Sequence, residues 1–174
     1  MEKIKVSGEQ MARMVLACLG LCEIVGIDIN GKETVKVVCK VKRGEPLELQ
    51  NIDPLDNCPN FTDWSVERNG EDLQTVSFCY RNCNYDCQSD ELTMDAEDFG
   101  WVVDLFLDRV FGNVEYNDID IDDSTGFIRI KVDFVTCDME PLELGKFDMQ
   151  YLVLAGIKLN IVSAKDGEYV IELH

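Results

Sequence analysis

The sequence predicts an α+β fold, in which helices pack on antiparallel sheet, built from an internally duplicated unit. Apolar residues recur at helical spacing in two separate segments. Runs rich in β-branched residues are joined by Asn-Gly and Asp-Gly pairs, which are typical of hairpin turns. A helix on an antiparallel sheet is the usual way for such elements to bury their apolar faces.

Several landmarks occur twice and in the same order along the 174 residues. The pentapeptide EPLEL, an Ile-Asp-Ile strand segment and a hairpin turn recur with offsets of 95, 92 and 97 residues. The matched segments are 45–49 with 140–144, 27–29 with 119–121, and 69–70 with 166–167. Two copies at so long a period indicate a duplicated domain, not a solenoid.

Each copy is expected to contain a helix, a hairpin, a loop and a second hairpin. In the first copy we expect a helix from Ser7, which forms a capping box with Gln10, to about Ile24. Its strands are expected near 27–29, 33–42, 64–68 and 71–80. In the second copy we expect a helix from Asp95 to about Phe111 and strands near 114–121, 127–135, 158–163 and 168–173. Residues 147–155 can form a helix or a strand, and we favour a helix.

These elements divide the chain into a first repeat, residues 1–80, a cysteine-containing linker, residues 81–94, and a second, more acidic repeat, residues 95–174. Two arrangements are compatible with this order. Each repeat can form its own sheet covered by its own helix. Alternatively, one continuous sheet joins both copies around a pseudo-two-fold axis.

The eight cysteines favour a reducing cytoplasm and free thiols, since no secretory signal precedes them. Cys18, Cys22 and Cys39 fall on apolar faces and are expected in the core. Four others, Cys58, Cys79, Cys83 and Cys87, are candidate ligands of an all-cysteine zinc site. Free thiols in a turn-rich linker are the favoured alternative, so no cofactor is predicted.

Acidic residues alternate along 118–123. An EF-hand calcium loop is disfavoured there, because the sixth position is Asp123 where glycine is needed and the twelfth is Arg129 where glutamate is needed. In a strand, Asp118, Asp120 and Asp122 would share one face as a ladder of like charges, with no compensating ladder of lysines evident. The repulsion in such a ladder indicates a functional role, and a plain solvated face is the alternative.

The helix expected from Asp95 has an acidic side that contains a tryptophan. Glu97, Asp104 and Asp108 share this side with Trp101, opposite an apolar stripe. Trp101 is expected either to pack against another element of the fold or to anchor an interface, since tryptophan is a favoured hot-spot residue.

The formal net charge is −18, and it is uneven. Residues 1–50 are nearly neutral, whereas residues 82–125 hold 13 acidic residues and one basic residue, a net −12. This charge argues against direct binding to nucleic acid or to an anionic membrane. None of the common catalytic motifs occurs, and His174 is the single histidine, so no enzymatic activity is expected.

The leading hypothesis is a small acidic inhibitor that blocks a basic nucleic-acid-binding protein or nuclease by imitating nucleic-acid charge. In size and acidity the chain is similar to anti-CRISPR, anti-restriction and toxin-immunity proteins of phage and bacterial defence. The alternatives are a pseudo-symmetric protein-interaction module without inhibitory role and a small zinc protein. The expected partner-binding residues are Glu97, Trp101, Asp104, Asp108, Asp118, Asp120, Asp122 and Asp123.

Overall fold

The structure is a computed structural model that describes residues 2–20, 22–31, 33–41, 47–48, 55, 58–112, 114–134, 150–165 and 168–174. It confirms an α+β fold with antiparallel sheets. Both EPLEL segments lie largely or wholly outside the described residues, as does the turn expected at Asp166-Gly167. No helix in the part of the chain that is described is both long and apolar enough to cross a membrane.

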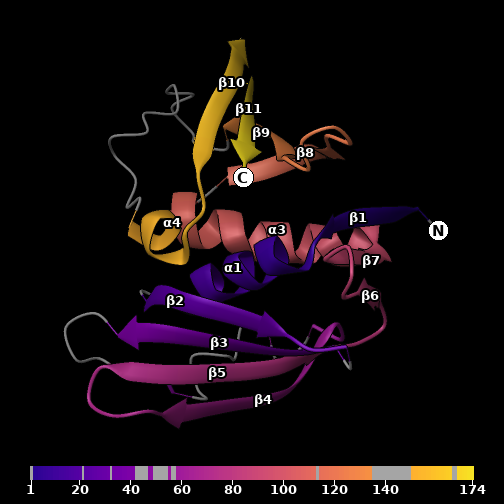
Figure 1. The fold of residues 1–174 in the computed structure, drawn as a ribbon. Coiled ribbons are helices and arrows are strands. Elements are labelled where there is room, and N and C mark those ends of the chain that lie inside the picture. The colour runs from indigo at the N-terminus through magenta and orange to yellow at the C-terminus, as the bar shows by residue number, and fades with distance from the viewer. Residues whose placement is uncertain are drawn as a thin grey trace.

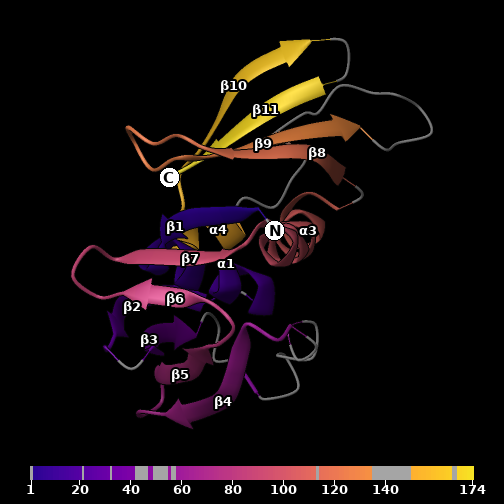
Figure 2. The same cartoon turned by 90° about the vertical axis from the view of Figure 1, so that its right-hand side faces the viewer.

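Two four-stranded antiparallel sheets lie on either side of the helices (Figures 1 and 2). The first sheet has the order β2-β3-β5-β4 and the second the order β8-β9-β11-β10. The first comprises β2 (Cys22–Ile29), β3 (Thr34–Val41), β4 (Phe61–Arg68) and β5 (Leu73–Tyr80). The second comprises β8 (Val114–Ile121), β9 (Ile128–Phe134), β10 (Leu159–Lys165) and β11 (Glu168–Leu173).

A third, smaller sheet has the order β1-β7-β6 and joins the N-terminal segment to the middle of the chain. Its strands are β1 (Lys3–Ser7), β6 (Asn84–Asp86) and β7 (Glu91–Asp95). β1 leads directly into α1 (Gly8–Leu19), and β7 leads directly into α3 (Ala96–Phe111). The segment 81–94, predicted as a cysteine-containing linker, contains β6 and most of β7.

One hydrophobic core joins the helices and both large sheets. Met14 of α1, Phe78 of β5, Phe106 of α3 and Ile130 of β9 are all fully buried members of it. The short helix α4 (Gln150–Ala155) contacts α1 and β2. An element from the second half of the chain thus packs against elements of the first half. The expectation of a helix within 147–155 is therefore confirmed for residues 150–155.

The first helix is shorter than its apolar pattern predicts, since it ends at Leu19 and not near Ile24. Gly20 caps it, and its N–H donates to the Leu16 carbonyl. The residues from Cys22 onward pair with β3 instead, and Val25 is exposed in that strand. Pairing with a neighbouring strand outweighs the helical spacing of the apolar residues here. The β-branched residues in this segment also favour a strand over a helix.

The other expected elements are close to those observed. The hairpins around Asn30-Gly31 and Asn69-Gly70 form as predicted, as β2–β3 and β4–β5. Asp95 sits at the N-cap of α3, as expected. Its side chain makes no capping hydrogen bond, however, and instead forms an ion pair of 2.5 Å with Lys3. The alternative of one continuous sheet is not observed among the described residues, where the two large sheets are separate.

Asp90 holds the start of α1 although it lies 83 residues away in the sequence. One carboxylate oxygen accepts hydrogen bonds from the Ser7 hydroxyl, at 2.7 Å, and from the Glu9 N–H, at 3.3 Å. The other accepts from the Tyr85 hydroxyl at 2.8 Å. Asp90 has a φ of 52°, a left-handed conformation that aspartate tolerates better than most residues.

We predict that Asp90→Ala lowers the free energy of unfolding by about 2 kcal/mol, because it removes a helix cap and leaves two hydroxyl donors without their acceptor. Urea denaturation monitored by circular dichroism measures this. Glu91→Gln is the matched control: it breaks only an exposed ion pair with Lys5 and should change the value by less than about 0.5 kcal/mol. Equal effects of the two substitutions would contradict the assignment.

Candidate functional site

The exposed side of α3 carries the tryptophan and three of the acidic residues that the sequence singled out. Glu97, Asp104 and Asp108 are exposed there, and Trp101 retains 58% of its accessible surface. The opposite side of the helix is buried, as the spacing predicted. Among the residues that the structure describes, no element therefore covers Trp101, as the alternative of internal packing would require. We refer to Glu97, Trp101, Asp104 and Asp108 as the α3 surface.

Arg109 is the single basic residue of α3, and its guanidinium is directed toward other helices. Its Nε donates to the Cys18 carbonyl at 3.2 Å, near the C-terminal end of α1. The guanidinium carbon also lies 5.7 Å from the centre of the Tyr151 ring of α4. Arg109 thus stabilises the contacts among the three helices, and the α3 surface itself consists of carboxylates around an indole.

The acidic residues of β8 have basic neighbours, contrary to the ladder of uncompensated charge expected from the sequence. The register places Asp118 opposite Lys131 and Asp120 opposite Arg129 on β9. Directly opposed residues lie on the same face of a sheet, so these are pairs of unlike charge. Glu172 of β11 extends the row, since its carboxylate is 3.1 Å from Arg129 Nε. This face is one of alternating charge, not a negative ladder.

Asp122 and Asp123 lie at the turn between β8 and β9, where Asp122 has a structural role. Its carboxylate accepts hydrogen bonds from the Ser124 hydroxyl, at 2.6 Å, and from the backbone N–H groups of Ser124 and Thr125. It also forms an ion pair of 2.8 Å with Arg129. The Ser124 bonds, with that of Thr125 and the charge of Arg129, lower the pKa of Asp122 to about 2. Asp123 is exposed beside it.

The four candidate zinc ligands are not brought together as a closed site. Cys58 is buried, Cys79 and Cys83 are partly buried, and Cys87 is exposed. Cys79 Sγ lies 3.6 Å from the Thr34 hydroxyl. Within the described ranges, which contain all four cysteines, no group of three or more cysteine, histidine or acidic side chains is placed to hold a metal ion.

Burial disfavours the reactive thiolate form at two of these four cysteines. It raises the pKa of Cys83 to about 12 and raises the pKa of Cys58 as well, since removal from water disfavours the thiolate. The predicted core cysteines Cys18 and Cys39 are buried, and the pKa of Cys18 rises to about 12 for the same reason. The side chain of Cys22 lies outside what the structure describes.

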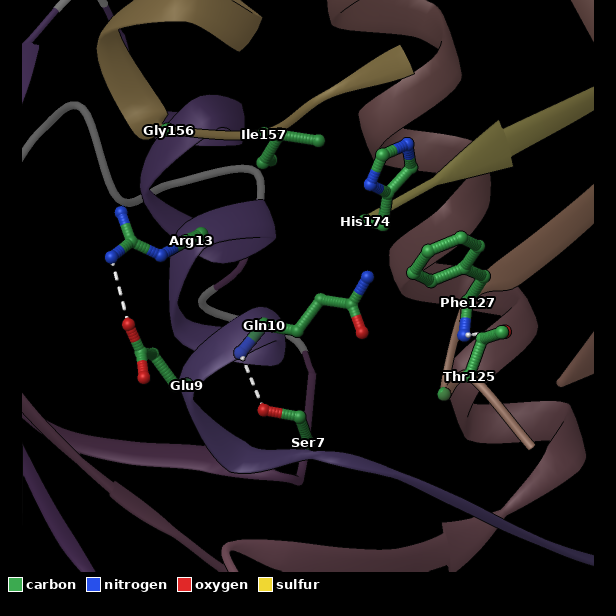
Figure 3. Close-up of a pocket in the computed structure, with 10 residues that line it drawn as sticks. Ser7, Glu9, Gln10, Arg13, Thr125, Phe127, Gly156, Ile157 and His174 are labelled. Carbon is green, nitrogen blue, oxygen red and sulfur yellow. Dashed lines mark hydrogen bonds and ion pairs between the residues drawn. The ribbon is translucent and has the colours of Figure 1, made fainter. Parts of the chain in front are cut away.

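A pocket of about 280 Å³ lies beside the first turns of α1 (Figure 3), and no pattern in the sequence predicts it. Gln10 and Arg13 line one side, and the stacked rings of Phe127 and His174, 4.2 Å apart, line the other. The polar groups on the α1 side already bind protein atoms. Arg13 bonds to Glu9 and to the Ala155 carbonyl, and the Gln10 amide donates to the Leu173 carbonyl.

Side chains that line this pocket therefore connect α1 to the C-terminal strand. Few of their polar groups are left to bind a ligand. Gln10 and Leu173 are 163 residues apart, so no local pattern in the sequence connects them. Its residues carry none of the motifs that would mark a binding site. The α3 surface, by contrast, contains a tryptophan that is 58% exposed.

Comparison with known proteins identifies no relatives: no protein-family model, no curated protein and no solved structure matches this chain.

We predict that the Asp122 carboxyl titrates with a midpoint near pH 2, and that Ser124→Ala moves this midpoint up toward 3.8. Because the folded-state pKa is lowered, the stabilisation by Asp122 is complete above about pH 4 and is lost as the pH falls toward 2. Carboxyl-carbon NMR chemical shifts measure the titration. Arg129→Met should raise the midpoint less, because the Ser124 hydroxyl bond is the largest influence. A wild-type midpoint at 3.8 would contradict the geometry of the turn.

We predict that iodoacetamide at pH 8 modifies Cys87 first and Cys58 and Cys83 slowly, because Cys87 is exposed and the pKa values of the other two are raised. Peptide mass spectrometry follows each site, and Cys87→Ser should remove the fast reaction. Prior incubation with zinc should leave the rate at Cys87 unchanged. Protection of all four candidate cysteines by zinc would instead restore the all-cysteine metal site.

Proposed function

We propose that this chain is a non-enzymatic binding protein whose α3 surface docks on a basic surface of another protein. The observation that carries the proposal is Trp101, a large aromatic side chain that is 58% exposed among Glu97, Asp104 and Asp108. Tryptophan supplies much of the energy at protein interfaces when a partner covers it. Carboxylates around such an anchor favour a positively charged partner and raise the rate of encounter.

We propose further that the partner handles nucleic acid and that binding inhibits it. Surfaces that bind phosphate are basic, and a protein of net charge −18 with 12 of the excess negatives between residues 82 and 125 can occupy one in place of nucleic acid. The six cysteines whose side chains are described are free thiols, which supports action in the reducing cytoplasm.

The pairing of β8 with β9 reduces the number of acidic residues that we propose for the centre of the contact. Asp118 and Asp120 face Lys131 and Arg129, and Asp122 is held within its turn, so these residues offer less free negative charge than a strand of aspartates would. We propose the α3 surface as the centre of the interface. The acidic residues of 118–123 then belong to its rim, where charge affects the rate of association more than the affinity.

The internal duplication is also a proposal, and the topology supports it. Each half has the order strand, helix, two strands, then two further strands, with α4 before the last two strands of the second half. The two large sheets have the same strand order, β2-β3-β5-β4 and β8-β9-β11-β10. Two hydrogen bonds recur at an offset of 88 residues: Gly8 N–H donates to the Asp90 carbonyl, and Ala96 N–H donates to the Glu2 carbonyl. Each half would then supply one sheet and the helix that covers it.

This pseudo-symmetry favours the second candidate function, an interaction module that presents two related surfaces and uses its acidity only for solubility. The two candidates differ in what charge does. Inhibition by mimicry requires the carboxylates of the α3 surface, whereas the module binds its partner without them.

We predict that at least one of a panel of purified basic nucleases, comprising restriction endonucleases, CRISPR effector nucleases and ribonucleases, binds the full chain at 20 mM salt and loses activity. Glu97→Gln, Asp104→Asn and Asp108→Asn together should weaken this binding by tenfold or more, since three charge contacts are lost; about 1.4 kcal/mol in total suffices. Surface plasmon resonance at 20 and 200 mM salt and a cleavage assay measure both effects.

The control is a variant with the same change of charge on the first sheet: Glu23→Gln, Asp28→Asn and Glu67→Gln, all exposed in β2 and β4. It should retain binding within about twofold, since only long-range attraction changes. Binding that both variants weaken equally would show that net charge, and not the α3 surface, is responsible. Absence of binding across the panel at low salt would overturn the proposal of mimicry, and unchanged binding by the first variant would favour the interaction module.

A further inference from the structure

We propose that the group bound at the centre of the α3 surface is an arginine side chain of the partner, stacked on the indole of Trp101. This inference rests on the proposed function and specifies the chemistry of its contact. It distinguishes a site for arginine from a surface that attracts any positive charge.

The neighbours of Trp101 along the helix define the contact. Glu97 is four residues before it and Asp104 three residues after it, so both lie one helical turn away on the same side of α3, with Cβ atoms about 5–6 Å from that of Trp101. All three side chains are exposed. A cation placed over the indole therefore lies between two carboxylates, one on each adjacent turn.

Leu105 and Asp108 complete the surroundings on the C-terminal side. Leu105 is half-buried at the edge of the surface and packs against the core, so it forms an apolar border beside the ring. Asp108 extends the carboxylates a further turn. The surface thus combines a flat aromatic group, an apolar edge and acceptors on both sides.

Arginine matches this combination better than lysine. Its guanidinium is planar, is weakly hydrated and stacks on an aromatic ring while its N–H groups point outward in the plane toward acceptors. An ammonium group is compact and strongly hydrated, so it must give up water to approach the indole. Exposed carboxylates attract both cations, and a single exposed ion pair contributes little to affinity. We therefore infer that the aromatic ring supplies most of the selectivity.

The experiment compares two dye-labelled peptides of equal length and charge, one with six arginines and one with six lysines separated by glycines, binding to the full chain at 20 mM salt. Fluorescence anisotropy gives each dissociation constant. The wild-type chain should bind the arginine peptide about two- to fivefold more tightly, the range expected for an exposed cation–π contact.

Substitutions then separate the ring from the charge. Trp101→Ala should reduce the ratio of the two affinities to about one, and Trp101→Phe should give an intermediate ratio, since tryptophan is the best aromatic partner. Asp104→Asn should weaken both peptides and preserve the ratio. Val153→Ala, at a 73% exposed site on α4, controls for the loss of exposed apolar surface and should change neither affinity.

The outcomes distinguish this inference from the proposed function. Equal binding of the two peptides by the wild-type chain would overturn the arginine site and leave a non-selective acidic surface. A ratio that persists in Trp101→Ala would also overturn it, because selectivity would then arise elsewhere. If neither peptide binds at 20 mM salt, the arginine site and the basic partner are both wrong.

Discussion

The antiparallel pairing of β1 with β7 is the interaction on which the rest of the structure depends. It joins residues 3–7 to residues 91–95, and each of the two strands continues into one of the two long helices. The same pairing brings Asp90 to the start of α1 and the Glu2 carbonyl to the start of α3, so that each helix begins on a hydrogen bond from the opposite half. The first N–H group of each helix is thus satisfied across the junction between the halves.

This junction also determines which sides of the helices are buried. α1 and α3 contact each other, α1 is further covered by α4, and α3 contacts β8. Because α4 belongs to the second half and packs on the helix of the first, neither half is a separate body in the core, and one hydrophobic cluster includes both. The side of α3 that carries Trp101 is left facing solvent by this arrangement.

Local patterns in the sequence predict most of the helices and strands. They do not predict which of these elements pair or pack with one another. The Asn-Gly turns predicted two hairpins, and the apolar stripe of α3 predicted which side is buried, because these features depend on residues close in the sequence. The end of α1 was misplaced, since pairing of β2 with β3 overrides helical spacing after Leu19. The charge balance of β8 was also missed: that Asp118 faces Lys131 depends on strand register, which the sequence of one strand does not contain. For the same reason the contacts of Asp90 and of Gln10 had no sequence signal.

The two long helices can be compared by numbering their residues from Ser7 and from Asp95. Equivalent positions then have different roles in the two halves. Arg13 of α1 and Trp101 of α3 occupy the same position, six residues after these starts, and Leu16 and Asp104 both follow at nine. On α1 these positions serve the fold, because Arg13 binds the Ala155 carbonyl and Leu16 is fully buried. On α3 an aromatic ring and a carboxylate occupy them, and both are exposed. An exposed tryptophan contributes little to stability, since its apolar surface gains only from burial. In the complex that we propose, a partner that covers Trp101 would supply that burial, and the surrounding carboxylates would favour a partner that is positively charged at the point of contact.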